Sequence, residues 1–379
     1  MRVPAPATPV RPTMPRALPD PLRFQPMPVA GATASSAASD LWREWDVLAE
    51  RLDAPPFLRP GWFRAWHGAY GDGELRLLSV RRGDELAGVL PVEIKGTATL
   101  SPTNTHTPLY GPVADGAEME SALVRELLEL AKGRIELAYA DPGARWFSLL
   151  RDALPGTRRS DRRSVMVETI TRPPYVSTAG GWDAYRAERS RKFMKELGRQ
   201  RRRLAEQGAL ELAVHTSVDG VQAALDEFVA LESSGWKAAE GTAIGSRDAS
   251  RRFYSELARW LAERGWLRLA FLRLDGRAIA AELDIACAGA LYSLKSGFDT
   301  EYRAFGPGQL LTHDCVKLAF DDGLASYEFL GTDEAYKMSW TASTRERARV
   351  RSFPRTVSGD LSAVARHYGR PMVRRLRRG

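Results

Sequence analysis

A short glycine-containing segment, residues 303–311 with the sequence RAFGPGQLL, carries the sharpest chemical signal in the chain. It follows an apolar stretch typical of a strand, Leu291–Phe298, and leads into a stretch typical of a helix. Glycines let the backbone approach a ligand closely, and the free N–H groups at a helix start attract anions. The segment therefore predicts a pyrophosphate-binding loop, to which Arg303 adds a charge-assisted contact.

The glycine spacing excludes two other phosphate-binding loops. The segment lacks the six-residue glycine pattern of a dinucleotide-binding turn, and it lacks the Gly-Lys-Ser/Thr of a P-loop. The residues indicate a pyrophosphate without saying which one.

Two carboxylates at alternate positions of a second apolar segment, Ile279–Ile285, suit proton transfer. Strand parity places Ala280, Glu282 and Asp284 on one face, away from the four apolar residues of the same segment. Next to an anion-binding loop, Glu282 could act as the general base that removes a proton from an attacking ammonium, with Asp284 as the second candidate. The alternative is a strand that faces solvent at the edge of a sheet.

Three more polar residues lie close to these elements. Asp299 stands where the strand passes into the loop, and it either orients an acceptor amine or caps the turn. Tyr336 and Lys337 follow the last predicted strand, where Lys337 could meet an acceptor phosphate or carboxylate and Tyr336 could protonate a leaving thiolate. The alternative for this pair is a surface lysine beside a packed tyrosine.

The pattern Arg-x-x-Gly-x-Gly between a strand and a helix resembles the acyl-CoA pyrophosphate loop of the GNAT N-acetyltransferase superfamily. Arg303, Gly306 and Gly308 match that loop position for position. The resemblance implies an acyl-CoA cosubstrate whose pyrophosphate is held by backbone amides. The cofactor-binding residues that it implies are Arg303, Phe305, Gly306, Gly308, Gln309 and Leu310.

Four further segments narrow the resemblance: residues 190–193 (SRKF), 232–237 (ESSGWK), 292–299 (YSLKSGFD) and 331–340 (GTDEAYKMSW). Together they are similar to the CelD-like branch of GNAT, which is often linked with cellulose or exopolysaccharide loci. That branch is similar in turn to the FemAB peptidoglycan aminoacyltransferases with their twin GNAT folds. The substrate-binding residues that this implies are Trp236, Lys237, Tyr292, Lys295 and Asp299, although Trp236 could equally be a core residue.

The elements that position these residues occur twice along the chain. Residues 75–80 and 86–92 predict a hairpin, and residues 267–272 and 279–285 predict another about 192 residues later. Each hairpin follows a helical stretch with tryptophan and precedes a loop, a helix and a short strand. We therefore expect an α+β fold of two tandem GNAT-like domains, each with a mixed central sheet flanked by helices.

The two copies differ at the site. No Arg-x-x-Gly-x-Gly follows the first hairpin, where Gly111-Pro112 stands alone, and Val89 aligns with Glu282. We expect a degenerate domain over residues 40–165, which shapes the acceptor cleft, and a catalytic domain over 182–345. The Pro- and Ala-rich residues 1–39 predict a disordered leader, and residues 346–379 a basic tail.

Basic residues are concentrated in two segments. The chain has a net charge of +8, whereas residues 341–379 hold 11 Arg and 2 acidic residues and residues 186–203 hold 9 basic and 2 acidic residues. The two segments carry +9 and +7, so the remainder carries 8 − 16 = −8. The helix predicted over 186–203 has a thin apolar stripe, Phe193, Leu197 and Leu204, and its arginine-rich side suits a phosphate-bearing acceptor.

Composition limits the remaining possibilities. The two cysteines, Cys287 and Cys315, exclude a disulfide scaffold and favour a reducing, cytoplasmic setting. The five histidines show no spacing typical of a metal site, so no metal is expected. No apolar run approaches the length of a membrane span.

These observations predict an acyl-CoA-dependent N-acyltransferase, acting on an amino sugar, amino acid or peptide. Glu282 would be the base, and a backbone amide of strand 291–298 would polarise the thioester between splayed strands. One alternative is an aminoacyl-tRNA-dependent transferase that acts on a cell-wall precursor. Another is a non-catalytic protein that binds nucleic acid or anions through its two basic segments.

Overall fold

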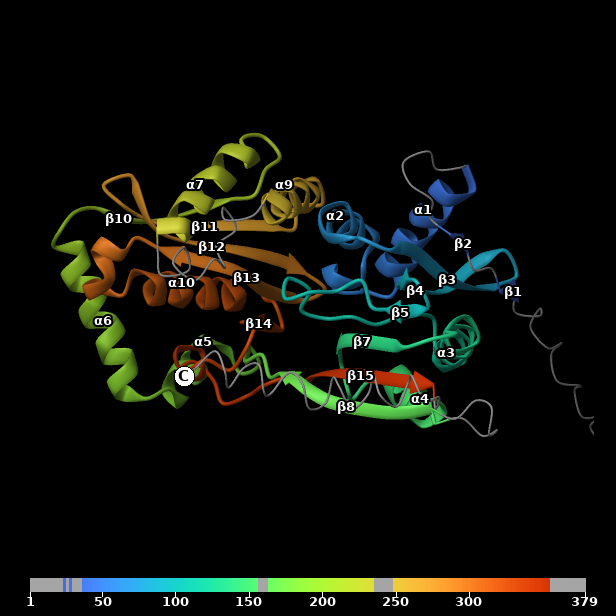
Figure 1. The fold of residues 1–379 in the computed structure, drawn as a ribbon. Coiled ribbons are helices and arrows are strands. Elements are labelled where there is room, and N and C mark those ends of the chain that lie inside the picture. The colour runs from blue at the N-terminus through green and yellow to red at the C-terminus, as the bar shows by residue number, and fades with distance from the viewer. Residues whose placement is uncertain (1–22, 25–26, 29–35, 156–162, 235–247, 355–379) are drawn as a thin grey trace, which may run out of the picture.

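The computed structural model describes residues 23–24, 27–28, 36–155, 163–234 and 248–354 of the chain. These residues form two mixed sheets that lie side by side, each with helices packed on it (Figure 1). The α+β fold predicted from the sequence, with two mixed sheets flanked by helices, is confirmed.

The elements of the first half are β1 (Arg23–Phe24), β2 (Met27–Pro28), α1 (Ser36–Arg51), η1 (Pro56–Leu58), α2 (Pro60–Tyr70), β3 (Glu74–Arg82), β4 (Glu85–Lys95), β5 (Ala98–Leu100), β6 (Val113–Ala114), α3 (Ala117–Leu130), β7 (Ile135–Ala140), α4 (Arg145–Ala153) and β8 (Arg163–Thr171). Those of the second half are β9 (Tyr175–Ser177), α5 (Gly181–Glu188), α6 (Arg191–Ala205), β10 (Leu210–His215), α7 (Val221–Ser234), α9 (Asp248–Glu263), β11 (Leu267–Leu274), β12 (Arg277–Cys287), β13 (Ala290–Phe298), η4 (Thr300–Phe305), α10 (Pro307–Asp321), β14 (Ser326–Glu328), α11 (Ala335–Met338) and β15 (Arg347–Pro354).

The repeated hairpin is present in both halves. β3 pairs antiparallel with β4, and β11 pairs antiparallel with β12, each through a tight turn. Gly83 and Gly276 adopt positive φ angles in these turns, a conformation that costs glycine little. A helix and a short strand follow each hairpin, as α3 and β7 in the first half and as α10 and β14 in the second.

The second sheet, in the order β10-β11-β12-β13-β14-β9, carries the predicted chemistry. Alternation along β12 sends Ala281, Leu283 and Ile285 toward α7 and α9. The opposite face packs against α10, whose Leu311, Cys315 and other apolar residues are buried there. Helices therefore cover both faces of this sheet (Figure 1), so no face of β12 is open to bulk solvent.

The domain boundaries predicted from the sequence need correction at three places. β15 (Arg347–Pro354) lies between β7 and β8 in the first sheet, so the first part of the expected basic tail is a buried strand. β8 extends the first domain beyond residue 165. β9, from the linker that follows, joins the second sheet beside β14. Alternating apolar and basic residues in β15 explain why composition alone suggested a tail.

Two further expectations are corrected. The basic segment 186–203 spans two helices, α5 and α6, because Ser190 caps the start of α6 by accepting a hydrogen bond from the Phe193 N–H. The expected leader contains β1, β2 and the first residues of α1, which begins at Ser36, before the expected start near Asp40. The other residues of the leader, and residues 355–379 of the tail, lie outside the described part of the chain.

The two halves share one hydrophobic cluster. Trp62 of α2 packs edge-on against Phe253 of α9, with ring centroids 5.4 Å apart. A Cβ at Gly61 would stand 2.1 Å from the Trp260 ring, so the glycine lets the two helices approach. Because this shared core fixes the halves against each other, residues of both can line one cavity. Across the described ranges, no helix is long and apolar enough to cross a membrane.

Candidate active site

The predicted anion-binding loop starts α10. η4 ends at Gly306, whose φ of +61° and ψ of 44° are left-handed. Pro307 follows as the first residue of α10 and has no N–H to satisfy. Helix geometry leaves the next N–H groups, those of Gly308 and Gln309, without an acceptor inside the helix. Both amides, together with the helix dipole, favour an anion at this end of α10.

A cavity of about 320 Å³ lies beside the loop. A Cβ at Gly306 would stand 2.6 Å from Gln200 Oε1, and a Cβ at Gly308 would stand 3.3 Å from the Phe298 ring. Both glycines therefore let the Gln200 and Phe298 side chains pack directly against the backbone of the loop. The residues that line the cavity, termed the loop cavity below, are Glu232, Ser296, Gly297, Phe298, Arg303, Gly306, Pro307, Gly308, Gln309, Thr312 and Tyr336.

Two of the six predicted loop residues have other roles. The Leu310 side chain is buried in the core, and its N–H already donates to Gly306 O at 3.1 Å. Phe305 does not line the loop cavity, and the Arg203 guanidinium lies 5.1 Å from its ring centroid. Gln309 does line the cavity, and its Oε1 accepts a hydrogen bond from Trp340 Nε1 at 3.1 Å.

A second cavity, of about 360 Å³, lies between the two halves and is termed the interdomain cavity. The first half contributes loop 105–108 and Tyr139 to its lining. The complete lining is Thr105, His106, Thr107, Pro108, Tyr139, Thr171, Pro173, Tyr254, Glu282, Ser293, Leu294, Lys295, Ser296, Thr312, Tyr327, Phe329, Leu330, Gly331, Thr332, Glu334, Tyr336 and Lys337.

The two cavities meet at three residues. Ser296, Thr312 and Tyr336 line both of them. The meeting point lies where β13 and β14 separate, since their parallel pairing covers only Ala290–Tyr292 of β13. Beyond Tyr292 the outer edge of β13 has no strand partner in the described part of the chain, which leaves backbone groups able to bind a ligand.

Glu282 lines the interdomain cavity next to this junction and accepts hydrogen bonds from three hydroxyl groups. It is 1 % exposed. Its Oε1 accepts hydrogen bonds from Ser293 Oγ at 2.6 Å and from the Tyr327 hydroxyl, and its Oε2 accepts one from Thr312 Oγ1 at 3.2 Å. Because each carboxylate oxygen has two lone pairs, Oε2 keeps one that can accept a proton.

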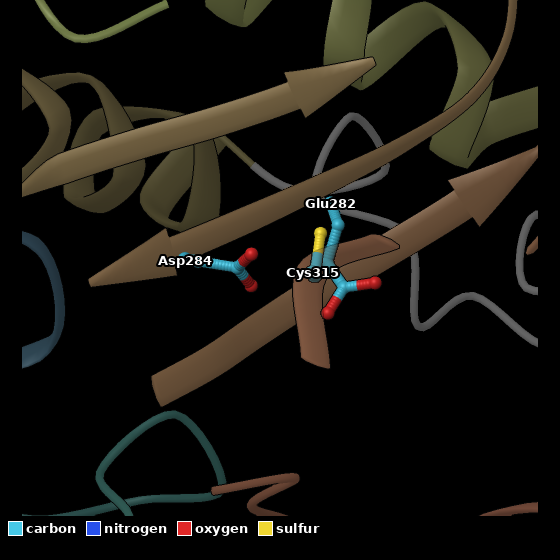
Figure 2. A group of neighbouring side chains, drawn as sticks. All are labelled: Glu282, Asp284 and Cys315. Atoms are coloured by element: carbon cyan, nitrogen blue, oxygen red, sulfur yellow. The ribbon is translucent and has the colours of Figure 1, made fainter. Parts of the chain in front are cut away.

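Asp284 lies beside Glu282 on the same strand face, as strand parity predicts. Figure 2 shows its carboxyl group directed toward Glu282 and Cys315, and the three groups have ligand atoms within 4.8 Å of one another. Burial, followed by the charge of Glu282, raises the pKa of Asp284 well above its ordinary value. Burial also raises the pKa of the Cys315 thiol, which excludes a reactive thiolate at neutral pH.

These three groups are the set of potential metal ligands that the described residues bring together. One thiol with a raised pKa and two carboxylates are a poor match for a metal site, because thiolate ligands must lose their protons. Glu282 already accepts hydrogen bonds from three hydroxyl groups in this arrangement. We therefore assign no metal to the cluster.

Tyr336 and Lys337 both line the interdomain cavity, on α11. Tyr336 is 46 % exposed at the junction. Partial burial of its hydroxyl, together with nearby Glu334 and Glu282, raises its pKa, so the hydroxyl keeps its proton. Lys337 is buried, and its Nζ donates to Leu330 O at 3.0 Å and pairs with Glu334 at 2.5 Å. The lysine is thus neither a plain surface residue nor unpaired.

The remaining predicted substrate residues are dispersed. Lys295 lines the interdomain cavity, with its Nζ 3.8 Å from Glu232 Oε1. Tyr292 lines neither cavity, and its ring packs edge-on against Phe57 of the first half at 5.0 Å. Asp299 also lines neither cavity, because it caps η4 through the Glu301 N–H and pairs with Arg277 at 2.6 Å. Trp236 and Lys237 lie outside the described residues.

Sequence reasoning missed the hydroxyl donors to Glu282. Ser293, Thr312 and Tyr327 come from β13, α10 and β14, which only the folded sheet brings together. A helical period from Gly308 would have placed Thr312 one turn along the same face of α10. Nothing in the sequence around His106 or Thr107 points to the cavity, because those residues come from the other half of the chain.

Comparison with known proteins agrees with this geometry. Residues 191–338 match the family model of the acetyltransferase (GNAT) domain. The solved structure of FemX aligns with a TM-score of 0.56 at 14 % identity, over 82 % of this chain and 95 % of FemX. L-PGS from Bacillus licheniformis aligns with a TM-score of 0.54 at 11 % identity, over 86 % of this chain and 96 % of L-PGS.

A search of curated proteins found no match. The family match covers the loop, both carboxylates and α11, and the two structural alignments extend the shared fold over both halves of the chain. Residues 191–338 therefore resemble an acetyltransferase (GNAT) domain, within a two-part fold that this chain shares with FemX and L-PGS.

Proposed function

We propose that this protein is an acyl-CoA-dependent N-acyltransferase whose acceptor amine binds between the two halves. The observation that carries the proposal is the junction of the two cavities at Ser296, Thr312 and Tyr336. A donor in the loop cavity and an acceptor in the interdomain cavity would meet there, beside Glu282. Acyl transfer needs this arrangement, because the amine must reach the thioester carbon while a base lies within hydrogen-bond distance of the amine.

The loop cavity suits the pyrophosphate and the thiol arm of CoA. The amides of Gly308 and Gln309 point out of the start of α10, and Arg303 lines the same cavity. Gly306 and Gly308 line the same cavity with backbone alone, so a ligand can approach the loop backbone there. Acyl-CoA supplies the carbonyl carbon that the amine attacks, so that a C–N bond forms while the C–S bond breaks.

The chain's own residues supply the proton transfers. Glu282 accepts the proton that the acceptor ammonium loses, either directly at Oε2 or through the hydroxyl of Thr312. The unpaired edge of β13 offers a backbone N–H to the carbonyl oxygen as negative charge develops. Tyr336 retains its proton and donates it to the departing sulfur. Two protons leave the acceptor nitrogen in all, one before attack and one as the amide forms, while one proton reaches the thiolate, so each ammonium that is acylated releases one proton to solvent.

The lining of the interdomain cavity favours a compact hydroxylated amine, and we propose an amino sugar or a related envelope or exopolysaccharide precursor. Aromatic rings and hydroxyl groups dominate the lining, which suits sugar faces and sugar hydroxyls. Lys337 keeps one N–H direction beyond its bonds to Leu330 and Glu334, so it could bind a phosphate or carboxylate on the acceptor.

The basic face of α6 supports a second candidate, an aminoacyl-tRNA donor. Arg191, Lys192, Lys195, Arg199 and Arg202 are exposed on a helix that packs beside η4 and α10. A polyanion such as tRNA could bind along this face. FemX and L-PGS share the fold, but at their low identities the likeness does not decide the donor.

The two donors are separated by an assay of thiol release and product formation. Acetyl-CoA and a pool of aminoacyl-tRNAs are each supplied with a panel of amino sugars, and products are identified by mass. We expect acetyl-CoA to support amide formation, and Arg303→Ala to raise its KM more than it lowers kcat. Transfer from aminoacyl-tRNA with none from acetyl-CoA would replace the first proposal with the second.

A further inference from the structure

Two buried carboxyl groups share one face of β12, and the described residues place no cation against them. Glu282 and Asp284 are each 1 % exposed, and the described residues offer neither Asp284 oxygen a hydrogen-bond partner of normal geometry. Figure 2 shows the Asp284 carboxyl directed at its neighbours, Glu282 and Cys315. Two unscreened negative charges this close in a dry interior repel each other strongly, so one of the two groups must be neutral or a cation must be present.

The basic side chains of the surrounding elements are engaged elsewhere. Arg268 of β11 is the cross-strand partner of Asp284, but its guanidinium donates to Gly265 O at 2.9 Å and to Leu267 O at 2.8 Å. Lys337 pairs with Glu334, and Lys317 of α10 pairs with Asp321. No cation therefore neutralises the carboxyl pair in the described part of the chain.

The other groups that face the pair carry no positive charge either. Ser293 of β13 is the cross-strand partner of Asp284 and donates to Glu282. Cys315 of α10 and Tyr327 of β14 are the titratable neighbours, and the pKa of each is raised, first by burial and then by Glu282 and Asp284. Both are therefore neutral at physiological pH, and the polar groups that the described residues direct at the pair are hydroxyl and thiol groups.

We propose that Asp284 is a neutral carboxylic acid in the folded protein, and that the pair carries a single negative charge on Glu282. Hydrogen bonding decides which partner is ionised, because hydrogen bonds stabilise a carboxylate. Glu282 accepts hydrogen bonds from three hydroxyl groups, whereas Asp284 accepts none of normal geometry. A neutral acid also removes the need for a cation in the cluster.

On this view Asp284 is a positioning residue. It fills the space behind Glu282 without adding a charge, so the carboxylate at the cavity junction remains available to accept a proton. This consequence for catalysis rests on the proposed function, whereas the charge state of Asp284 does not. The test below measures the charge state without any substrate, so failure of one proposal is distinguishable from failure of the other.

The charge state has a definite effect on stability. Because burial and the Glu282 charge raise the pKa of Asp284 in the folded state, the folded protein holds a proton that the unfolded chain releases above about pH 4. Stability contributed at this site therefore falls as the pH rises from there toward the folded pKa. One such proton changes the unfolding equilibrium constant about tenfold per pH unit.

The experiment compares the wild-type protein with Asp284→Asn by denaturant unfolding between about pH 5 and pH 8. Asparagine keeps the size of the side chain and cannot ionise. In the wild type, we expect the unfolding equilibrium constant to rise about tenfold per pH unit over this range. The variant should lack this dependence. Glu282→Gln should lessen the same slope, because it removes the charge that opposes ionisation of Asp284.

Asp314→Asn is the matched control on α10. Burial alone would raise the pKa of Asp314, but hydrogen bonds from His313 and Arg201 lower it, so Asp314 is already ionised at neutral pH. Its replacement should leave the slope above about pH 5 unchanged. Turnover of Asp284→Ala and Asp284→Asn is also compared. If the residue positions Glu282, the asparagine variant should retain more turnover than the alanine variant.

Infrared spectroscopy keeps the proposal testable if a variant fails to fold. The folded wild-type protein at neutral pH should show the carbonyl band of a buried protonated carboxyl group. The Asp284→Asn variant should lack this band. Equal slopes in the wild type and Asp284→Asn, or absence of that band, would overturn the proposal. One equivalent of zinc that co-purifies with the wild type and is lost in Asp284→Asn would overturn it in favour of a metal.

Discussion

Replacement of Glu282 by glutamine tests the role of the carboxylate without changing the shape of the site. Glutamine can place its Oε1 where Ser293 and Tyr327 donate, so only the hydroxyl of Thr312 must turn to face an NH₂ group. Apart from its effect on the ionisation of Asp284, the substitution should change the free energy of unfolding by about 1 kcal/mol or less, since one neutral hydrogen bond is worth about that much. Loss of a general base should lower kcat by about 100- to 10,000-fold.

The assay measures kcat and the acetyl-CoA KM across the neutral and mildly alkaline range, beside a thermal melt. Glu93→Gln is the matched control, because Glu93 is a buried glutamate of the first half whose Oε1 alone accepts the Asp72 and Gly73 N–H groups. Glutamine can keep both bonds, so this variant should retain wild-type kcat. A folded Glu282→Gln protein with unchanged kcat at every pH would refute the assignment of the base.

Three further substitutions test the loop and the junction, one of them as a control. Gly306→Ala forces a side chain into φ +61°, which should destabilise the fold by about 1–2 kcal/mol and weaken acetyl-CoA binding, measured by melting and titration. Gly276→Ala, at φ +83° in a hairpin turn, should destabilise similarly while leaving acetyl-CoA affinity unchanged, and equal affinities in both variants would count against the loop. Tyr336→Phe should lower kcat about 100-fold or more with little change in acetyl-CoA KM, and a rise in KM alone would assign the hydroxyl to binding instead.

Much of the fold could be predicted from the sequence because local periodicity and turn residues determine where the helices, strands and hairpins form. Alternation along β12 places Glu282 and Asp284 on one face, and the turn residues place both hairpins correctly. The loop that starts α10 is predicted because glycine and proline restrict the local backbone whatever the rest of the chain does.

Long-range pairing is what the sequence could not supply. β15 inserts between β7 and β8 after the chain has completed the second sheet, and no local pattern marks such a return. The same limit hid the hydroxyl donors to Glu282, which come from three separate elements. The packing of Tyr292 against Phe57 of the other half is a long-range contact of the same kind, which no local pattern predicts.

The identity of the donor is the central claim, and its most direct test is calorimetric titration of CoA and acetyl-CoA into the purified protein. We expect saturable binding to the wild type and a loss of about 10- to 100-fold in affinity for Arg303→Ala, the range for a hydrogen bond to a charged group. Arg277→Ala, which removes a neighbouring arginine paired with Asp299 outside both cavities, should bind as the wild type does. Absence of CoA binding to the folded wild-type protein would contradict the account.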